Sequence, residues 1–192
     1  EAQINSRPPP GNPRTVDFAR SMRERYPDER RFISAVLQWF HSEPFFYTLA
    51  PPLLEEGEPV DMFLFDTRRG FCEHYASAFV VMLRAAGIPA RVVTGYQGGE
   101  INPRGGYMIV RQSDAHAWAE AIIDGRWQRF DPTAAVAPSR IERGLFGSVP
   151  AGDPVPFFSR QDGGWLKSVQ LAIDAINHQW RRNVIEFNHD RQ

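Results

Sequence analysis

The 192-residue sequence has one cysteine, Cys72, and one lysine, Lys167. One cysteine excludes an internal disulfide and a four-cysteine zinc site. The longest unbroken apolar run is Ala78 to Leu83, which is too short for a transmembrane helix or for the apolar region of a signal peptide. The 22 basic and 23 acidic side chains leave a net charge of -1, so the composition gives no reason to expect a nucleic acid as partner.

What is present is typical of one globular domain, because 42% of the residues are hydrophobic and 23% are charged. Residues 1–14 include Pro8, Pro9, Pro10 and Pro13, and they predict an extended proline-rich arm before a single domain over 15–192. Helices precede a run of strands in that domain, which predicts an α+β fold with an antiparallel sheet packed against a central helix.

The hydrophobic periodicity and the turn residues predict the individual elements. We expect helices over 15–27, starting at Thr15 or Asp17, over 28–41 with Asp28 as N-cap, over 72–87 and over 165–187, and strands over 45–49, 90–96, 107–111, 115–123 and 126–131. Residues 53–61 look like an acidic loop, and 134–164 look like a long surface excursion.

Cys72 is predicted in the first turn of the central helix, directly after Gly70-Phe71. The positive end of the helix dipole and the unpaired backbone N–H groups there both favour a thiolate, the nucleophilic form of cysteine. The alternative is a small buried apolar residue, since free cysteines are often buried.

The Asp124-Gly125 turn predicts a two-residue hairpin that places His116, Trp118, Glu120, Arg129 and Asp131 on one face. His116 then lies diagonally across from Asp131, at roughly 7–8 Å between backbones, within reach of longer side chains. A carboxylate that orients an imidazole beside a nucleophile is the logic of a catalytic triad. The alternatives are a structural histidine and a turn residue before a proline.

Two other members of this face have simpler interpretations. Glu120 and Arg129 are expected to form a cross-strand ion pair, worth a few tenths of a kcal/mol if exposed. Trp118 is either a core residue or a wall of the site, and we retain it as a candidate substrate-binding residue. Cys72 and His74 do not form a metal pair, because two residues on a helix are about 200° apart. We therefore expect Glu73 and His74 to be solvated first-turn residues, and no metal or cofactor.

The motifs over residues 70–133 resemble those of the transglutaminase-like superfamily. The resemblance rests on Gly70-Phe71-Cys72-Glu73, on Tyr75-Ala76-Ser77-Ala78, on Ala85 to Tyr96, on His116-Ala117-Trp118-Ala119-Glu120, on Gly125-Arg126-Trp127 and on Phe130-Asp131-Pro132-Thr133. It implies a papain-like α+β core with Cys72 as nucleophile, His116 as base and Asp131 as orienting carboxylate. Within the superfamily, the sequence is most similar to the periplasmic domains of bacterial inner-membrane proteins.

The resemblance implies acyl transfer through a cysteine thioester, from a protein glutamine side chain to a primary amine with release of ammonia. The partners would be a glutamine-containing protein or peptide and an amine co-substrate, with no calcium implied. One alternative is a cysteine protease or amidase that uses the same triad on peptide or cell-wall amide bonds. A third possibility is a non-catalytic module that binds a peptide in the cleft.

The implied location is the periplasm, and the membrane would be reached only through segments outside this chain. We expect the natural chain to continue into hydrophobic spans of about 20 residues on at least one side. The helix expected over 165–187 has an apolar stripe, which either docks on the domain's own body or forms a stalk toward the bilayer.

Overall fold

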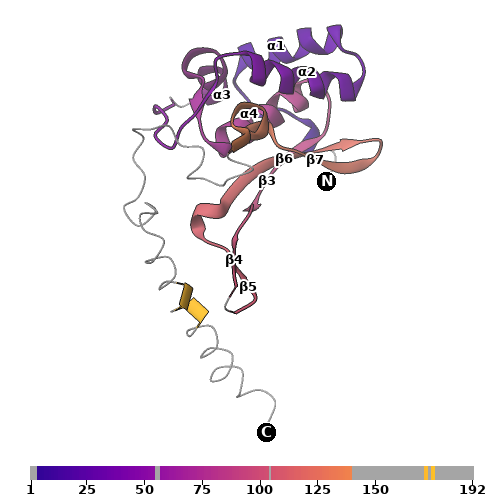
Figure 1. Ribbon diagram of the computed structural model, residues 1–192. Coiled ribbons are helices and arrows are strands. Elements are labelled where there is room, and N and C mark those ends of the chain that lie inside the picture. Colours follow the sequence, from indigo (N-terminus) through magenta and orange to yellow (C-terminus); the bar gives the residue numbers. More distant parts are fainter. Residues whose placement is uncertain (1–3, 55–56, 104, 140–170, 173, 176–192) are drawn as a thin grey trace. The chain divides into compact units, whose positions relative to one another are not determined.

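The computed structural model describes residues 4–54, 57–103, 105–139, 171–172 and 174–175 (Figure 1). The chain divides into two compact units, one made of 1–97 with 115–154 and the other of 98–114 with 155–192. The single domain expected over 15–192 therefore stays a prediction. Of the helix predicted over 165–187, the four described residues are helical, and the rest lies outside the described residues, as does most of the excursion over 134–164.

The first unit combines helices with a three-stranded antiparallel sheet, which confirms the predicted α+β class (Figure 1). Its elements are η1 (Ile4–Ser6), α1 (Pro13–Arg25), α2 (Glu29–Ser42), β1 (Phe46–Tyr47), α3 (Pro59–Asp61), the π-helix η2 (Met62–Thr67), β2 (Arg69–Gly70), α4 (Cys72–Ala85), β3 (Ala90–Tyr96), β6 (Ala115–Ile123), β7 (Arg126–Phe130) and α5 (Pro132–Val136).

The sheet has the order β3-β6-β7, and the central strand β6 packs against α4. On the face of β6 toward the core, Ala117, Ala119 and Ala121 are each at most 1% exposed. Because an alanine carries only a methyl group, this face lets the helix approach the sheet closely. The two predicted strands at 90–96 and 115–123 agree with β3 and β6 residue by residue.

An aromatic cluster packs around α4 on the side that faces the other helices. Tyr75 and Phe79 of α4 are fully buried, together with Phe32 and Phe40 of α2 and Phe63 of η2. Each such side chain contributes roughly 1.5–3 kcal/mol by leaving water. Burial raises the pKa of Tyr75 well above its ordinary value, so its hydroxyl stays protonated and donates to a backbone carbonyl of β1 at 2.8 Å.

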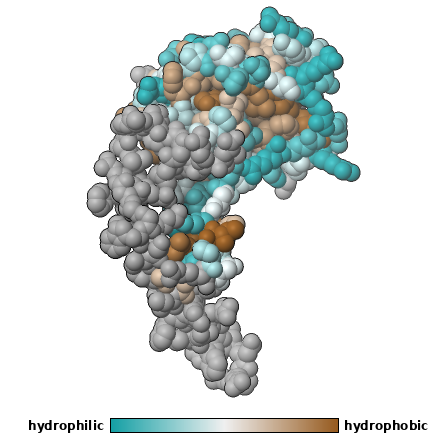
Figure 2. All heavy atoms as spheres, in the orientation of Figure 1, coloured by the Kyte–Doolittle hydropathy of each residue, from teal (hydrophilic) through white to brown (hydrophobic). Residues whose placement is uncertain are grey.

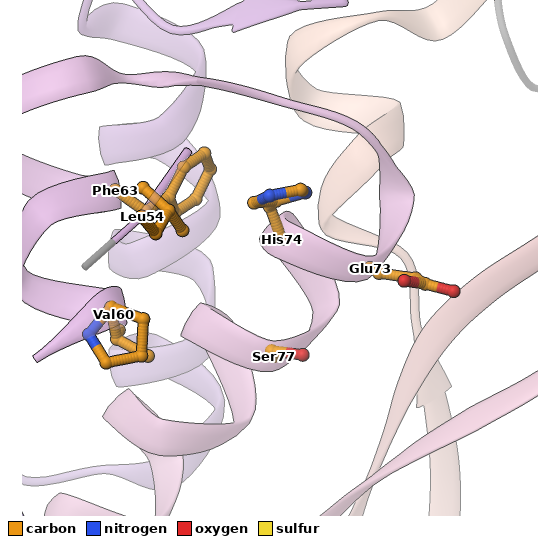
Figure 3. A pocket seen from close by; sticks show the side chains of 7 residues that line it. Leu54, Val60, Phe63, Glu73, His74 and Ser77 are labelled. Atoms are coloured by element: carbon orange, nitrogen blue, oxygen red, sulfur yellow. The ribbon is translucent and has the colours of Figure 1, made fainter. Parts of the chain in front are cut away.

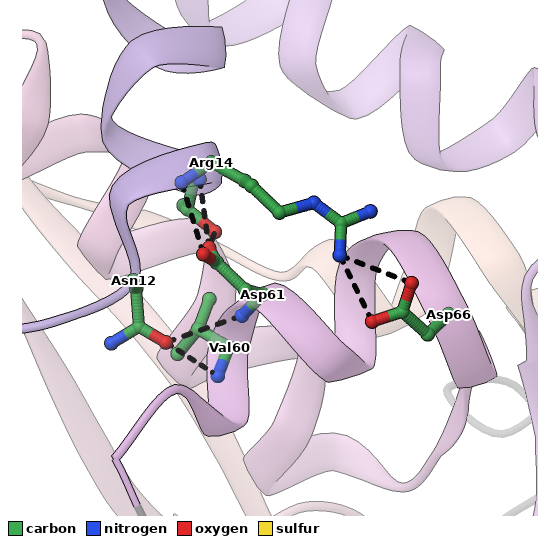
Figure 4. A network of polar contacts seen from close by, with 6 residues as sticks. Asn12, Arg14, Val60, Asp61 and Asp66 are labelled. Atoms are coloured by element: carbon green, nitrogen blue, oxygen red, sulfur yellow. Dashed lines mark hydrogen bonds and ion pairs between the residues drawn. The ribbon is translucent and has the colours of Figure 1, made fainter.

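The starts of α1 and of the short helix α3 cap each other, although they lie almost fifty residues apart in the sequence (Figure 4). The side-chain oxygen of Asn12 accepts two backbone N–H groups at the start of α3, at 2.8 and 3.2 Å. In return, the buried Asp61 carboxylate accepts the backbone N–H groups of Arg14 at 2.9 Å and Thr15 at 2.8 Å. This cap moves the start of α1 to Pro13, ahead of the predicted Thr15 or Asp17, so the last two residues of the expected arm are helical.

The segment before Cys72 contains more regular secondary structure than the sequence predicts. A π-helix, η2, follows α3 and ends at Thr67. The next residue, Arg68, has a φ of 52° and pairs with Glu43 at 2.6 Å. β2 then pairs in parallel with β1, with Phe46 opposite Arg69. These contacts fix the residues that lead into α4 and thereby position its first turn.

The second unit contains a hairpin of β4 (Glu100–Asn102) and β5 (Tyr107–Ile109), followed by η3 (Gln112–Asp114). The sequence predicted only the second of these strands. The buried Asn102 donates to the Tyr107 hydroxyl at 3.1 Å and to the carbonyl of Leu171 at 2.9 Å. Figure 2 shows brown apolar atoms in patches amid a mainly hydrophilic surface.

Candidate active site

Cys72 is the first residue of α4, as predicted, and its side chain is 8% exposed. It packs with Ala76 from the next turn of the helix and with Ala117 from β6. The first backbone N–H groups of an α-helix have no partner within the helix, so the Cys72 amide is available beside its own thiol. The thiol therefore sits where the helix meets the sheet.

His116 and Asp131 are joined as the hairpin register predicts. Ile123 pairs with Arg126 across the turn, and the pairing of β6 with β7 continues as far as Ala119 opposite Phe130. Past the last of these pairs, His116 Nε2 lies 2.7 Å from Asp131 Oδ2. The other oxygen of Asp131 accepts the Thr133 N–H at 3.2 Å, so this carboxylate orients the imidazole and also caps α5.

The imidazole of His116 has its second nitrogen directed into the protein. Nδ1 is buried and has no hydrogen-bond partner in the described part of the chain. Burial lowers the pKa of His116, but the hydrogen bond to Asp131 and the interaction with the nearby Cys72 thiol outweigh it, so the pKa is raised. The ring is thus held at one nitrogen by a carboxylate, which leaves the other for the thiol.

The ion pair predicted between Glu120 and Arg129 is wrong, although their cross-strand register is right. β3 places Arg91 opposite Glu120 on the other side of β6, and Arg91 makes two hydrogen bonds to Glu120, at 2.8 and 3.0 Å. Arg129 turns instead to Gln97, at 2.7 Å, and to Asp131, at 3.5 Å. The competing arginine comes from β3, which lies outside the hairpin of β6 and β7.

Trp118 lies directly beside the histidine. The Trp118 ring stacks on that of His116, with centroids 6.3 Å apart and 27° between planes. The guanidinium of Arg129, which is on β7, lies 4.1 Å from the centroid of the Trp118 ring. Nε1 of Trp118 is buried without a partner among the described residues. Trp118 is half-buried, so it is not a fully buried core residue, and its role as a wall of the site stays a prediction. Its contact with a substrate stays a prediction.

A separate open pocket of about 280 Å³ lies on another flank of α4 (Figure 3). It is lined by Leu54, Pro59, Val60, Phe63, Glu73, His74 and Ser77, and Cys72 is not among these residues.

His74 differs from its prediction as a solvated residue. Its ring packs between Phe63 and Phe71, and Nδ1 accepts the Phe71 N–H at 3.4 Å. Burial lowers the pKa of His74, and the neighbouring Glu73 only partly opposes this. His74 therefore supports the turn that carries Cys72. Among the described residues, no three His, Cys, Asp or Glu side chains gather as metal ligands.

Comparison with known proteins agrees with this geometry. The sequence profile of the transglutaminase-like superfamily matches residues 16–132. The chain therefore belongs to the transglutaminase-like superfamily, and the predicted resemblance is confirmed.

Two relatives in Pseudomonas aeruginosa cover most of the chain. A protein-glutamine gamma-glutamyltransferase is 46% identical over 190 residues, which are 95% of this chain and 28% of the relative. The crystal structure of the periplasmic domain of TgpA has a TM-score of 0.74 and 51% identity, over 77% of this chain and 52% of that one. This match agrees with the predicted periplasmic location and confirms the predicted fold.

A third relative is more distant. The uncharacterized protein YebA of Bacillus subtilis is 38% identical over 108 residues, or 53% of this chain and 15% of its own length. The chain thus spans less than a third of each curated relative named here. Within the described residues, no helix has both the length and the apolar character that crossing a bilayer requires.

Proposed function

We propose that the chain catalyses acyl transfer through a thioester on Cys72, with His116 and Asp131 completing a catalytic triad. The observation that carries this proposal is the 2.7 Å contact between His116 Nε2 and Asp131 Oδ2, on a ring whose other nitrogen is left for Cys72. The membership in the transglutaminase-like superfamily supports it. The acyl donor is the carboxamide of a glutamine side chain in a protein or peptide.

The first half-reaction forms the thioester. His116 Nδ1 takes the thiol proton, and the Cys72 sulfur forms a bond to the carboxamide carbon of glutamine. The C–N bond then breaks, and nitrogen leaves as ammonia with the proton that His116 returns. The Cys72 backbone N–H is one donor to the oxyanion of the tetrahedral intermediate. Asp131 keeps the imidazole in the tautomer that this transfer needs.

The second half-reaction consumes the thioester. A primary amine attacks the carbonyl carbon, His116 removes a proton from that amine, and the departing Cys72 thiolate is restored with the product amide. If water attacks instead, the product is a glutamate side chain and the chain acts as a hydrolase. The two outcomes share every residue and differ in how well the site excludes water and retains an amine.

The partners follow from this chemistry: a glutamine-containing protein or peptide and a primary amine, with Trp118 as a wall for the bound substrate. Because Lys167 is the only lysine, the chain offers almost no internal amine donor, so its own molecules should be poor amine substrates. We place the reaction in the periplasm as part of a longer inner-membrane protein, in line with the TgpA domain that the chain resembles.

The test supplies a glutamine-containing protein with a labelled primary amine and measures incorporated label beside released ammonia. We expect both signals with the wild-type chain and neither with Cys72→Ala. Ammonia without label would instead identify the hydrolase alternative, a protease or amidase. Neither signal across several donor proteins would contradict catalysis and favour the peptide-binding module.

A further inference from the structure

Four side chains form a closed ring of contacts around the proposed base. His116 Nε2 lies 2.7 Å from Asp131 Oδ2, and the same oxygen lies 3.5 Å from a terminal nitrogen of Arg129. The Arg129 guanidinium lies 4.1 Å from the centroid of Trp118, whose ring stacks on His116. Arg129 is the one member of this ring to which the proposed chemistry assigns no role.

Arg129 makes one further hydrogen bond, and the tryptophan beneath it is itself held against β3. The nitrogen that faces Asp131 also donates to Gln97 Oε1 at 2.7 Å, from the end of β3. Below the guanidinium, Trp118 packs against the backbone of β3 so closely that a Cβ on Gly95 would lie 2.8 Å from the indole. The arginine is therefore fixed over an aromatic face, although its own side chain is 46% exposed.

We propose that Arg129 is a positioning residue for the proposed triad: it holds the Asp131 carboxylate and shares that negative charge with His116. Asp131 then serves two cations, the imidazolium that forms during catalysis and a guanidinium that is permanently charged. The inference rests on the proposed function for its catalytic consequence, but the charge sharing itself is a property of the folded chain.

The groups that face His116 determine in which direction its pKa should move when Arg129 is removed. Asp131 and Cys72 are the charged or ionisable groups that act on the ring. β3 presents Gly95 opposite His116, and α5 carries no ionisable side chain. Among the described residues, Arg129 is therefore the only cationic side chain paired with Asp131 besides His116 itself. Removing that cation leaves the whole carboxylate charge to the imidazolium, which then holds its proton more tightly.

The experiment compares Arg129→Gln and Arg129→Lys with Arg126→Gln, a matched control on the same strand whose side chain is exposed. The titration of the His116 ring is followed by NMR, assigned with a His116→Gln variant. The rate of iodoacetamide alkylation is measured against pH, and this rate reports on Cys72 alone because it is the only cysteine.

We expect Arg129→Gln to move the His116 titration to higher pH, and the acidic limb of the kcat/KM profile to move with it, because the base must be neutral to accept the thiol proton. At neutral pH, kcat should fall about ten-fold with little change in KM, because acid–base catalysis needs a group that releases its proton readily. Arg129→Lys should restore most of both properties, and Arg126→Gln should match the wild type. An unchanged midpoint, or a midpoint at lower pH, would overturn the proposal and leave Arg129 as a structural residue.

The titration needs no substrate, so this test is separate from that of the proposed function. A His116 midpoint that moves to higher pH in a chain without amine transfer or ammonia release would support the charge sharing and contradict the function. A chain that transfers acyl groups with an unmoved midpoint would do the reverse.

Discussion

Replacement of Asp131 by asparagine should disable the base while changing almost no shape. One oxygen of Asp131 accepts the Thr133 N–H at 3.2 Å, and the other faces His116 Nε2 at 2.7 Å. An asparagine must keep its only oxygen toward Thr133 to cap α5, so its NH2 group turns toward His116. Nε2 then becomes an acceptor and the ring proton moves to Nδ1, the nitrogen that should receive the thiol proton.

The magnitude follows from the tautomer. In Ser-His-Asp triads the corresponding substitution lowers kcat about 10⁴-fold, which at 1.36 kcal/mol per factor of ten is about 5 kcal/mol of transition-state stabilisation. We expect a loss of about 10³- to 10⁴-fold here, measured as ammonia release at saturating substrate. Asp124→Asn is the matched control, because Asp124 is exposed at the hairpin turn and should lose little activity. A near wild-type rate for Asp131→Asn would show that the residue only caps α5.

The loss of stability caused by Asp131→Asn should depend on pH. The pKa of His116 is raised in the folded chain, so the charged pair stabilises the fold fully below the unfolded value of about 6.5. That contribution is lost as pH rises through the folded pKa. The free energy of unfolding of the wild type should therefore exceed that of Asp131→Asn by more at about pH 5 than at about pH 9, as measured by urea denaturation. A difference that grows with pH would refute the sign of the shift.

Two further substitutions test the support around the site. Gly95→Ala should displace Trp118, because the new Cβ would lie 2.8 Å from the indole, and overpacking of this kind costs about 1–3 kcal/mol. Both Tm and kcat should therefore fall, and an unchanged Tm would contradict the close contact. Asp61→Ala should lower the free energy of unfolding by about 2–5 kcal/mol, since it leaves several donors of α1 unpaired, whereas the exposed Asp66→Ala should cost less than about 1 kcal/mol. Equal losses in urea denaturation would rule out the reciprocal cap.

The geometry that joins His116 to Asp131 can be predicted from the sequence because it lies within one hairpin. The Asp124-Gly125 turn has a φ of 52° followed by 74°, as a two-residue hairpin requires, and it sets the register that joins His116 to Asp131. Cys72 follows from the helix periodicity alone.

Two features that the sequence did not predict have a different cause, which is pairing between segments far apart in the chain. Arg91 reaches Glu120 only because β3 pairs with β6, so a hairpin viewed alone assigns Glu120 to Arg129. The cap from Asp61 to α1 joins residues about fifty positions apart, and no local signal marks it. The π-helix before Cys72 was missed because its short, mostly apolar sequence has no distinctive periodicity.

We infer that the acyl group of the glutamine side chain is transferred through a thioester on Cys72, and intact-mass measurement tests this most directly. The wild-type chain is mixed with a glutamine-containing peptide and quenched in acid within one turnover, and its intact mass is measured by mass spectrometry. We expect a fraction of chains to be heavier by the mass of the peptide minus ammonia, with the addition mapped to Cys72 and absent from Cys72→Ala. Turnover of the peptide by Cys72→Ala, or an adduct on another residue, would contradict it.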